Sequence, residues 1–241
     1  MSEALAVLGF ATIPAVAIII GAFVAVMRTP SARTQSMVQH FAAGVVFAAV
    51  AGEVLPDLRD AHAPVATVIG FAIGVALMLL VKHLVESAAG GGDKEAPRTA
   101  KSLLIVVLVD VVIDGILVGV GFAAGKEKGI LIMVALTIEV LFLGLATIGE
   151  LLEAGASRRR AMATACLISS LLLVGAVIGV SLSFVAGGPF LIGLLAFSAA
   201  ALLYLVTEEL LVEAHEVPET PLSTAVFFVG FIVLFLIESA V

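Results

Sequence analysis

The chain has 241 residues, is 62% hydrophobic and has a mean hydropathy of +1.26. Soluble domains are about 45–50% apolar, so this composition predicts an all-α polytopic membrane protein and excludes an ordinary soluble one. The single cysteine, Cys166, excludes an internal disulfide and a cysteine metal cluster. The net charge of −7 argues against nucleic acid as a partner.

Eight stretches are long and apolar enough to cross a bilayer as helices, which takes about 20 residues each. They cover residues 4–27, 37–58, 64–86, 102–125, 129–153, 161–186, 189–213 and 222–240. The breaks between them carry proline, glycine and charge, and none is long enough for a second domain. We therefore expect one transmembrane domain over residues 1–241, with a mobile cytoplasmic linker near residues 87–101.

Lysine and arginine set the expected orientation, because they accumulate on the cytoplasmic side. With the N-terminus outside, nine basic residues fall inside: Arg28, Arg33, Lys82, Lys94, Arg98, Lys101, Arg158, Arg159 and Arg160. Three fall outside: Arg59, Lys126 and Lys128. This bias predicts that both termini are extracytoplasmic, in a bacterial-type inner (plasma) membrane.

An internal repeat appears when the sequence is shifted by 156 residues, so that 41–57 falls on 197–213. The matched pairs include Phe41 with Phe197, Glu53 with Glu209, Leu55 with Leu211 and Asp57 with Glu213. Because the two matched spans run in opposite directions, residues 1–86 and 161–241 are predicted to form inverted repeats around central helices in 102–153. Such symmetry is typical of transporters, whose substrate sites lie near the midplane.

Three carboxylates lie in the middle of predicted spans. Asp110 and Asp114 share one helix face, and a shift of 29 residues places Asp110 on Glu139 and Gly115 on Gly144. A charged Asp at a helix centre costs roughly 2.5–3.5 kcal/mol, and the sequence offers no cationic side chain at that depth. A divalent cation would compensate the negative charge of these carboxylates. The alternative is three protonated or water-bridged carboxyls that stabilise helix contacts.

Other polar clusters lie at the ends of spans. Glu53, Asp57, Asp60 and His62 follow span two, and Glu208, Glu209, Glu213, His215 and Glu216 follow span seven. A functional interpretation makes the two clusters an entrance and an exit for the metal, with Glu53, Asp57, Glu209 and Glu213 as the expected pathway residues. For Asp60, His62, His215 and Glu216, solvated interfacial charge is an equally good interpretation. We expect His40 and His83 to pack at the inner interface beside Lys82.

Small residues predict close helix contacts. Gly115-x-x-x-Gly119 and Gly175-x-x-x-Gly179 each allow another helix to approach. We expect the hydroxyls of Ser169 and Ser170 to bond to their own helix.

Two segments carry a family resemblance. Residues 40–58, HFAAGVVFAAVAGEVLPDL, and residues 194–216, LLAFSAAALLYLVTEELLVEAHE, resemble the second and seventh spans of the Zrt/Irt-like (ZIP) metal transporters, particularly the GufA-like branch. The resemblance extends over essentially the whole chain. It implies an eight-helix, 3+2+3 inverted-repeat bundle and a homodimer.

In that family the fourth span carries His-Asn-x-x-Glu/Asp-Gly, and the fifth a related motif ending in Glu-Gly; together they bind two metal ions. Here Asp110 stands at the His position, Val111 at the Asn position, and Asp114 keeps the acid before Gly115.

In the fifth span Glu139 stands at the first polar position, Val140 at the second, and Leu143 replaces the acid before Gly144. The Glu-Pro of the family's sixth span appears as Leu172-Leu173, and Val46 replaces a methionine. The resemblance therefore implies one metal site instead of two, and the lost imidazole puts zinc preference in doubt.

We therefore expect a transporter, not an enzyme, that moves a divalent cation (Zn, Mn, Fe, Co or Cd) toward the cytoplasm by alternating access. Asp110, Asp114 and Glu139 are the expected ligands, no cofactor is expected, and the partners are the metal and the lipid bilayer. The first alternative is a divergent ZIP-fold transporter for a monovalent cation or protons, with the metal site lost. An intramembrane aspartyl protease that uses Asp110 and Asp114 is disfavoured, because both aspartates lie on one helix. A non-transporting binding or scaffold protein is the last alternative.

Overall fold

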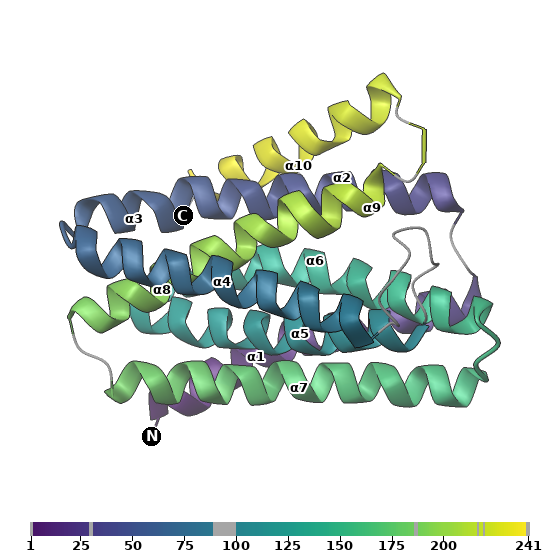
Figure 1. Cartoon of the computed structure of the whole chain (residues 1–241), viewed down its shortest axis with the longest axis horizontal. Helices are drawn as coiled ribbons and strands as arrows, with labels where there is room; N and C mark the ends of the chain where they lie inside the picture. The colour runs from purple at the N-terminus through teal and green to yellow at the C-terminus, as the bar shows by residue number, and fades with distance from the viewer. Residues whose placement is uncertain are drawn as a thin grey trace.

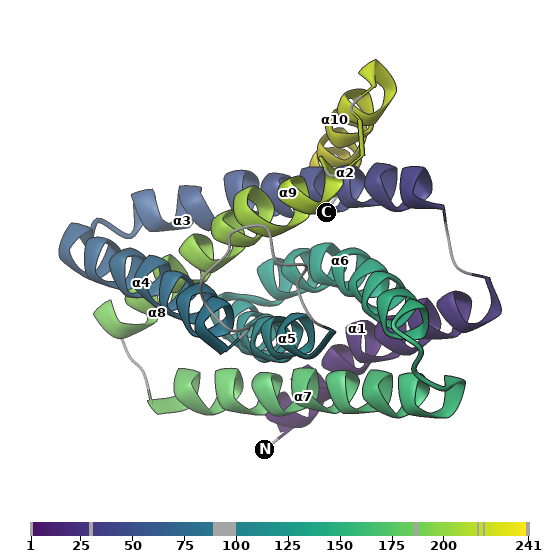
Figure 2. The ribbon, with the colours of Figure 1, turned by 45° about the vertical axis from the view of Figure 1, so that its right-hand side comes forward.

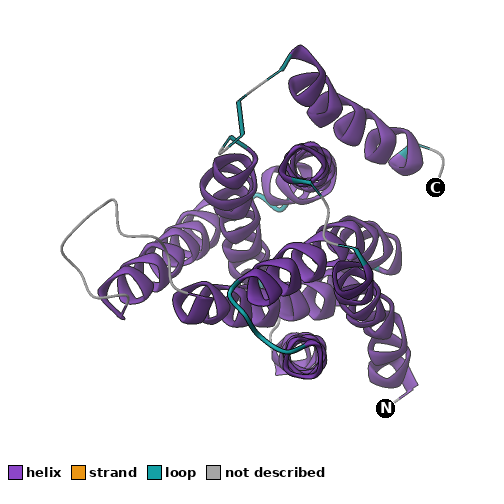
Figure 3. Ribbon diagram, turned by 90° about the vertical axis from the view of Figure 1, so that its right-hand side faces the viewer, coloured by secondary structure: helices purple, strands orange, loops and turns teal. Residues whose placement is uncertain are grey.

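The computed structural model describes residues 2–28, 31–88, 100–185, 188–215, 217–218 and 220–239. These residues form helices and no strand (Figure 3). Figure 1 labels the α-helices α1 (Ser2–Met27), α2 (Ala32–Ala49), α3 (Leu55–Asp60), α4 (Pro64–Ala88), α5 (Ala100–Ala124), α6 (Lys126–Glu153), α7 (Arg158–Val185), α8 (Pro189–Tyr204), α9 (Leu211–Ala214) and α10 (Pro221–Glu238). Two π-helical segments, η1 (Val50–Val54) and η2 (Leu205–Leu210), continue α2 and α8.

Seven stretches among the described residues are long and apolar enough to cross a membrane. They are Ala6–Met27, Ala32–Asp60, Pro64–Leu84, Lys126–Glu153, Arg158–Leu182, Pro189–Leu210 and Pro221–Glu238. Helix α5 is the remaining long helix and corresponds to the predicted span 102–125. The structure thus confirms the prediction of an all-α membrane protein.

Local sequence explains where several helices begin. The Ser31 hydroxyl accepts a hydrogen bond from the Thr34 amide at 3.2 Å and caps α2. Thr220 and Ser223 cap each other's backbone amides at the start of α10, where Pro221 fits because the first turn needs no amide donor. Between α6 and α7, Gly155 adopts a φ of 86°, a conformation that glycine reaches without steric cost.

The long helices pack in two groups. Helices α1, α5, α6 and α7 form one group, in which α5 lies along α7 and α1 along α6 (Figure 2). The second group pairs α2 with α10 and α4 with α8. Contacts of α2 with α6, and of α5 with α4 and α8, join the two groups. Helices α5 and α6 therefore lie where the two groups meet.

Close contacts at glycines repeat with the predicted spacing. Gly74 packs against the carbonyl of Phe197, and Gly230 against that of Phe41, so closely that neither position has room for a Cβ atom. Phe41 and Phe197 differ by 156 residues, and so do Gly74 and Gly230. These two contacts therefore have the same 156-residue spacing as the matched segments of the sequence.

The central helices show the shorter spacing. Gly115 packs against the carbonyl of Leu172, and Gly144, 29 residues later, against that of Ile18. Gly175 in turn packs against the carbonyl of Val112, so the small residues of α5 and α7 face each other. Without a side chain at these positions the helix backbones approach closely, as the spacing of the glycines predicts.

The sequence does not predict the π-helical segments. Segment η1 contains Glu53, and η2 contains Glu208 and Glu209. Glu53 and Glu209 are a matched pair of the 156-residue repeat. A π-segment inside a long helix is rare and often marks a functional site. These segments therefore direct attention to the acidic residues that they carry.

Some predictions need correction or lie outside the described residues. The Ser169 hydroxyl donates to the carbonyl of Ala15 on another helix at 2.7 Å, so the prediction of a bond within its own helix was wrong. Ser170 bonds to Cys166 within α7, as expected. The loop 89–99 with Lys94 and Arg98, the terminal residues Met1 and Val241, and Glu216 lie outside the described residues, as do the side chains of Lys101 and Glu213.

Candidate metal centre

Asp110 and Asp114 on α5 and Glu139 on α6 come together inside the bundle. Their exposed fractions are 4%, 1% and 1%. One carboxylate oxygen from each residue can be chosen so that all three lie within 4.8 Å of one another. Because four residues are about one helical turn, the two aspartates share a face of α5, and α6 brings Glu139 to the same point. The structure thus places the three predicted residues in one cluster.

Two oxygens of this cluster are buried without a hydrogen-bond partner: Oδ2 of Asp114 and Oε2 of Glu139. A buried acceptor without a partner costs about 1–3 kcal/mol, and more if it is charged. The side chains whose charges act most strongly on these two groups are carboxylates, with Glu209 of η2 acting on both. The cluster therefore has two oxygen atoms available to a cation, and a bound cation would stabilise the ionised form of these carboxyl groups.

An aliphatic cluster lies beside the carboxylates. Val111, Val140 and Leu172 are fully buried and pack with Ile18, and Leu143 packs against this cluster from its edge. Val111 and Val140 directly follow Asp110 and Glu139 in the sequence. This side of the site offers no ligand atoms from these side chains.

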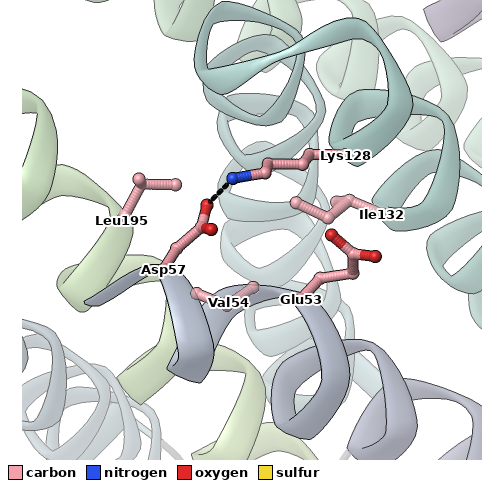
Figure 4. A pocket seen from close by; sticks show the side chains of 6 residues that line it. All are labelled: Glu53, Val54, Asp57, Lys128, Ile132 and Leu195. Carbon is pink, nitrogen blue, oxygen red and sulfur yellow. Dashed lines mark hydrogen bonds and ion pairs between the residues drawn. The ribbon is translucent and has the colours of Figure 1, made fainter. Parts of the chain in front are cut away.

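At the α3 end of the bundle, a small pocket is lined by Glu53, Val54, Asp57, Lys128, Ile132 and Leu195 (Figure 4). The ammonium group of Lys128 donates to Oδ2 of Asp57. The side chains of this ion pair are about one-third exposed.

An apolar layer separates this pocket from the carboxylates. Along α6, Ile132 and Leu136 lie between Lys128 and Glu139 at helical spacing, and both are buried. Lys128 and Glu139 are 11 residues apart, which is roughly 16 Å along a helix. In this conformation the pocket does not reach the carboxylate cluster.

At the opposite side of the cluster, Glu209 is half-buried and Glu208 forms an ion pair of 2.8 Å with Lys82. Glu209 belongs to the second helix group, whereas the three clustered carboxylates belong to the first. Asp60 and His62 are exposed at the α3 end, where Asp60 pairs with Arg59. These two residues are separate from the cluster.

Lys128 was expected only as a basic residue of the outer side, and its place in the pocket beside Asp57 was not predicted. A signal was present, because Lys128, Ile132 and Leu136 recur every four residues and Glu139 follows on the same face. Its partner Asp57 lies 71 residues earlier in the chain. No spacing rule connects residues so far apart, so only the tertiary structure reveals the pair.

The fold and the cluster together define a polytopic helical membrane protein with a buried group of acidic side chains, an architecture typical of ion transporters. Residues 88–238 match the family model of the ZIP zinc transporters, and the chain belongs to that family. Its members are transporters and not enzymes, so the protein is a membrane metal transporter. No curated protein sequence matches the chain.

Proposed function

We propose that the protein carries a divalent metal cation toward the cytoplasm through one site formed by Asp110, Asp114 and Glu139. The observation that carries this proposal is the convergence of three buried carboxylates, two of which have an oxygen without a hydrogen-bond partner. A divalent ion would supply the missing positive charge, and water or a backbone carbonyl would complete its coordination shell.

The ligand set favours a broad substrate range. Three carboxylates suit zinc, manganese, iron(II), cobalt and cadmium about equally, because no imidazole or thiolate selects among them. The positions at which the family resemblance implies ligands for a second ion are the buried aliphatic Val111, Val140 and Leu172. We therefore propose that one ion occupies the site at a time.

The two helix groups provide a means of alternating access. The carboxylates lie on α5 and α6 of one group, while Glu53, Asp57 and Glu209 lie on the second. Movement of one group against the other would expose the site first to the pocket of Glu53 and Asp57 and then to Glu209 and Glu213. The buried Ile132 and Leu136 close the first route in the present conformation.

Reconstitution into vesicles tests this function directly. Uptake of zinc, manganese and cobalt is measured for the wild type and for Asp110→Asn, with Asp60→Asn as the control because Asp60 is an exposed aspartate. We expect Asp110→Asn to abolish uptake and Asp60→Asn to leave it nearly unchanged. Equal uptake by the wild type and Asp110→Asn would rule out the carboxylate site as the route.

A second candidate is a ZIP-fold carrier of protons or a monovalent cation. The aliphatic cluster of Val111, Val140 and Leu172 favours it, since part of the family's metal-binding motif has been lost. A pH-sensitive dye inside the same vesicles distinguishes the two functions. Proton flux that needs Asp110 but no divalent metal would favour this candidate.

The orientation and assembly are also proposals. Both termini are expected outside an inner (plasma) membrane, and the family resemblance implies a homodimer. In a Cys166→Ala background, Asp60→Cys should react with an impermeant thiol reagent added outside, and Ser157→Cys should not. The mass of the purified protein in detergent, measured by light scattering, tests the dimer.

A further inference from the structure

Two histidines from distant parts of the chain meet at the end of the bundle where α2 begins. His40 lies on α2, and His215 follows the last residue of α9. Their ring centroids are 5.4 Å apart, with an angle of 67° between the ring planes. Helices α2 and α9 lie side by side here (Figure 1). The sequence predicts only packing for His40 and leaves His215 open between an exit role and solvated charge.

The first ring is held as metal-binding histidines usually are. His40 is 3% exposed, and its Nδ1 lies 2.8 Å from the carbonyl oxygen of Ser36. Since a carbonyl only accepts, Nδ1 carries the proton and donates, which leaves the lone pair on Nε2. A bond from the second ring nitrogen to a backbone carbonyl is the usual support of a metal-bound histidine.

The backbone beside the second ring is also fixed. The hydroxyl of Ser36, whose carbonyl holds His40, donates to the carbonyl of Ala214 at 2.7 Å. Ala214 directly precedes His215, and both Ser36 and Ala214 are buried. Ser36 therefore contacts His40 directly and the backbone carbonyl of the residue before His215, which lies 178 residues later in the sequence. Such preorganisation is what a two-residue site needs, because it has few ligands to offset the cost of ordering.

The distance between the rings suits a shared ion. A zinc ion lies about 2.1 Å from each imidazole nitrogen, and in a tetrahedral shell two such rings have centroids roughly 5 Å apart. The observed 5.4 Å is close to this value.

We propose that His40 and His215 form a second metal site, which takes a borderline divalent cation such as zinc with water in the remaining positions. Imidazole ligands favour zinc, cobalt and nickel over manganese and magnesium. The site is distinct from the carboxylate cluster, but Glu209, which acts on that cluster, is only six residues before His215. An ion leaving the carboxylates therefore has a nearby acceptor, and this transfer role rests on the proposed function.

The test separates the two sites by removing the first. Asp110→Asn combined with Glu139→Gln disables the carboxylate site, and zinc binding to the purified protein is then measured by titration calorimetry. We expect the double variant to bind one zinc ion per chain, more tightly than manganese. Bound cobalt(II) should show the visible absorption of a shell that contains imidazole nitrogen.

Adding His215→Gln to this double variant should abolish the remaining zinc binding. His83→Gln is the matched control, because His83 is an exposed histidine of α4, and it should leave binding intact. His215 is exposed, so its replacement leaves folding undisturbed; thermal melting confirms this, and His40→Gln provides a second variant.

The proposed histidine site would be overturned if the double variant binds no zinc, or if adding His215→Gln to it leaves zinc binding unchanged. The proposed function has a separate outcome. If wild-type transport requires Asp110 while the double variant binds no zinc, the result supports the carboxylate route and contradicts the histidine site. If the double variant binds one zinc ion through His215 while Asp110→Asn still transports metal, the result supports the histidine site and contradicts the carboxylate route.

Discussion

Replacement of Glu139 by glutamine separates a metal-binding role from a purely structural one. The substitution keeps the shape of a side chain that is 1% exposed and removes its charge. At an effective dielectric of about 20, two unit charges 4.8 Å apart repel by about 3.5 kcal/mol. If all three groups are ionised, the variant loses two of three such repulsions, and the cation loses one of three anionic ligands.

The expected loss of affinity is roughly 100-fold, equivalent to about 3 kcal/mol. At a metal concentration of about 100 times the wild-type Kd, binding stabilises the wild type by about 2.7 kcal/mol, and a 100-fold weaker variant by about 0.4 kcal/mol. For a globular chain of this size, 1 kcal/mol changes Tm by roughly 2–4 °C. The wild type should therefore gain roughly 5–11 °C with metal, and the variant about 1 °C.

Thermal melting in detergent, with and without zinc or manganese, measures the rise in Tm on metal binding and the stability of the metal-free protein. Without metal, Glu139→Gln should be at least as stable as the wild type, because the new amide can donate to a neighbouring carboxylate. Glu153→Gln is the matched control, since Glu153 is an exposed glutamate on the same helix. A full metal-dependent shift in Glu139→Gln would refute the site, and a strongly destabilised metal-free variant would indicate a structural role instead.

Three further predictions follow from the same geometry. Metal affinity should fall as pH falls, because protons compete with the ion for the carboxylates. Calorimetry across pH 5–8 should show proton release on binding. An affinity that does not depend on pH would contradict this prediction. Lys128→Met should lower the KM of uptake by up to roughly five-fold, since it removes a fixed positive charge beside Asp57 in a partly exposed ion pair. Asp57→Asn should instead raise the KM. An unchanged or higher KM in Lys128→Met would count against an entrance at this pocket. Gly115→Ala should destabilise the protein by about 1–3 kcal/mol, because its Cβ would overlap the carbonyl of Leu172. Gly9→Ala, at a helical glycine with open space, is the control in the same melting assay, and equal Tm values for the two variants would contradict the packing argument.

The sequence alone determined the membrane class, the spans and the members of the carboxylate cluster. Span length follows from bilayer thickness, so a run of about 20 apolar residues has one interpretation. Asp110 and Asp114 are four residues apart, which places them on one face of any helix. Glu139 could be added because the shift of 29 residues aligns it with Asp110, together with Gly144 and Gly115. These inferences need only the period of a helix and the cost of burying charge.

Only the tertiary structure decided which distant residues meet. The pairing of Lys128 with Asp57 depends on how α6 crosses the span formed by α2, η1 and α3. The contact of His40 with His215 depends on a serine that bonds to the carbonyl of Ala214, 178 residues away. Helical periodicity fixes the face on which a residue lies, but not the helix that covers that face. In this bundle the covering helix is selected by backbone contacts at small residues, whose partners the sequence does not specify.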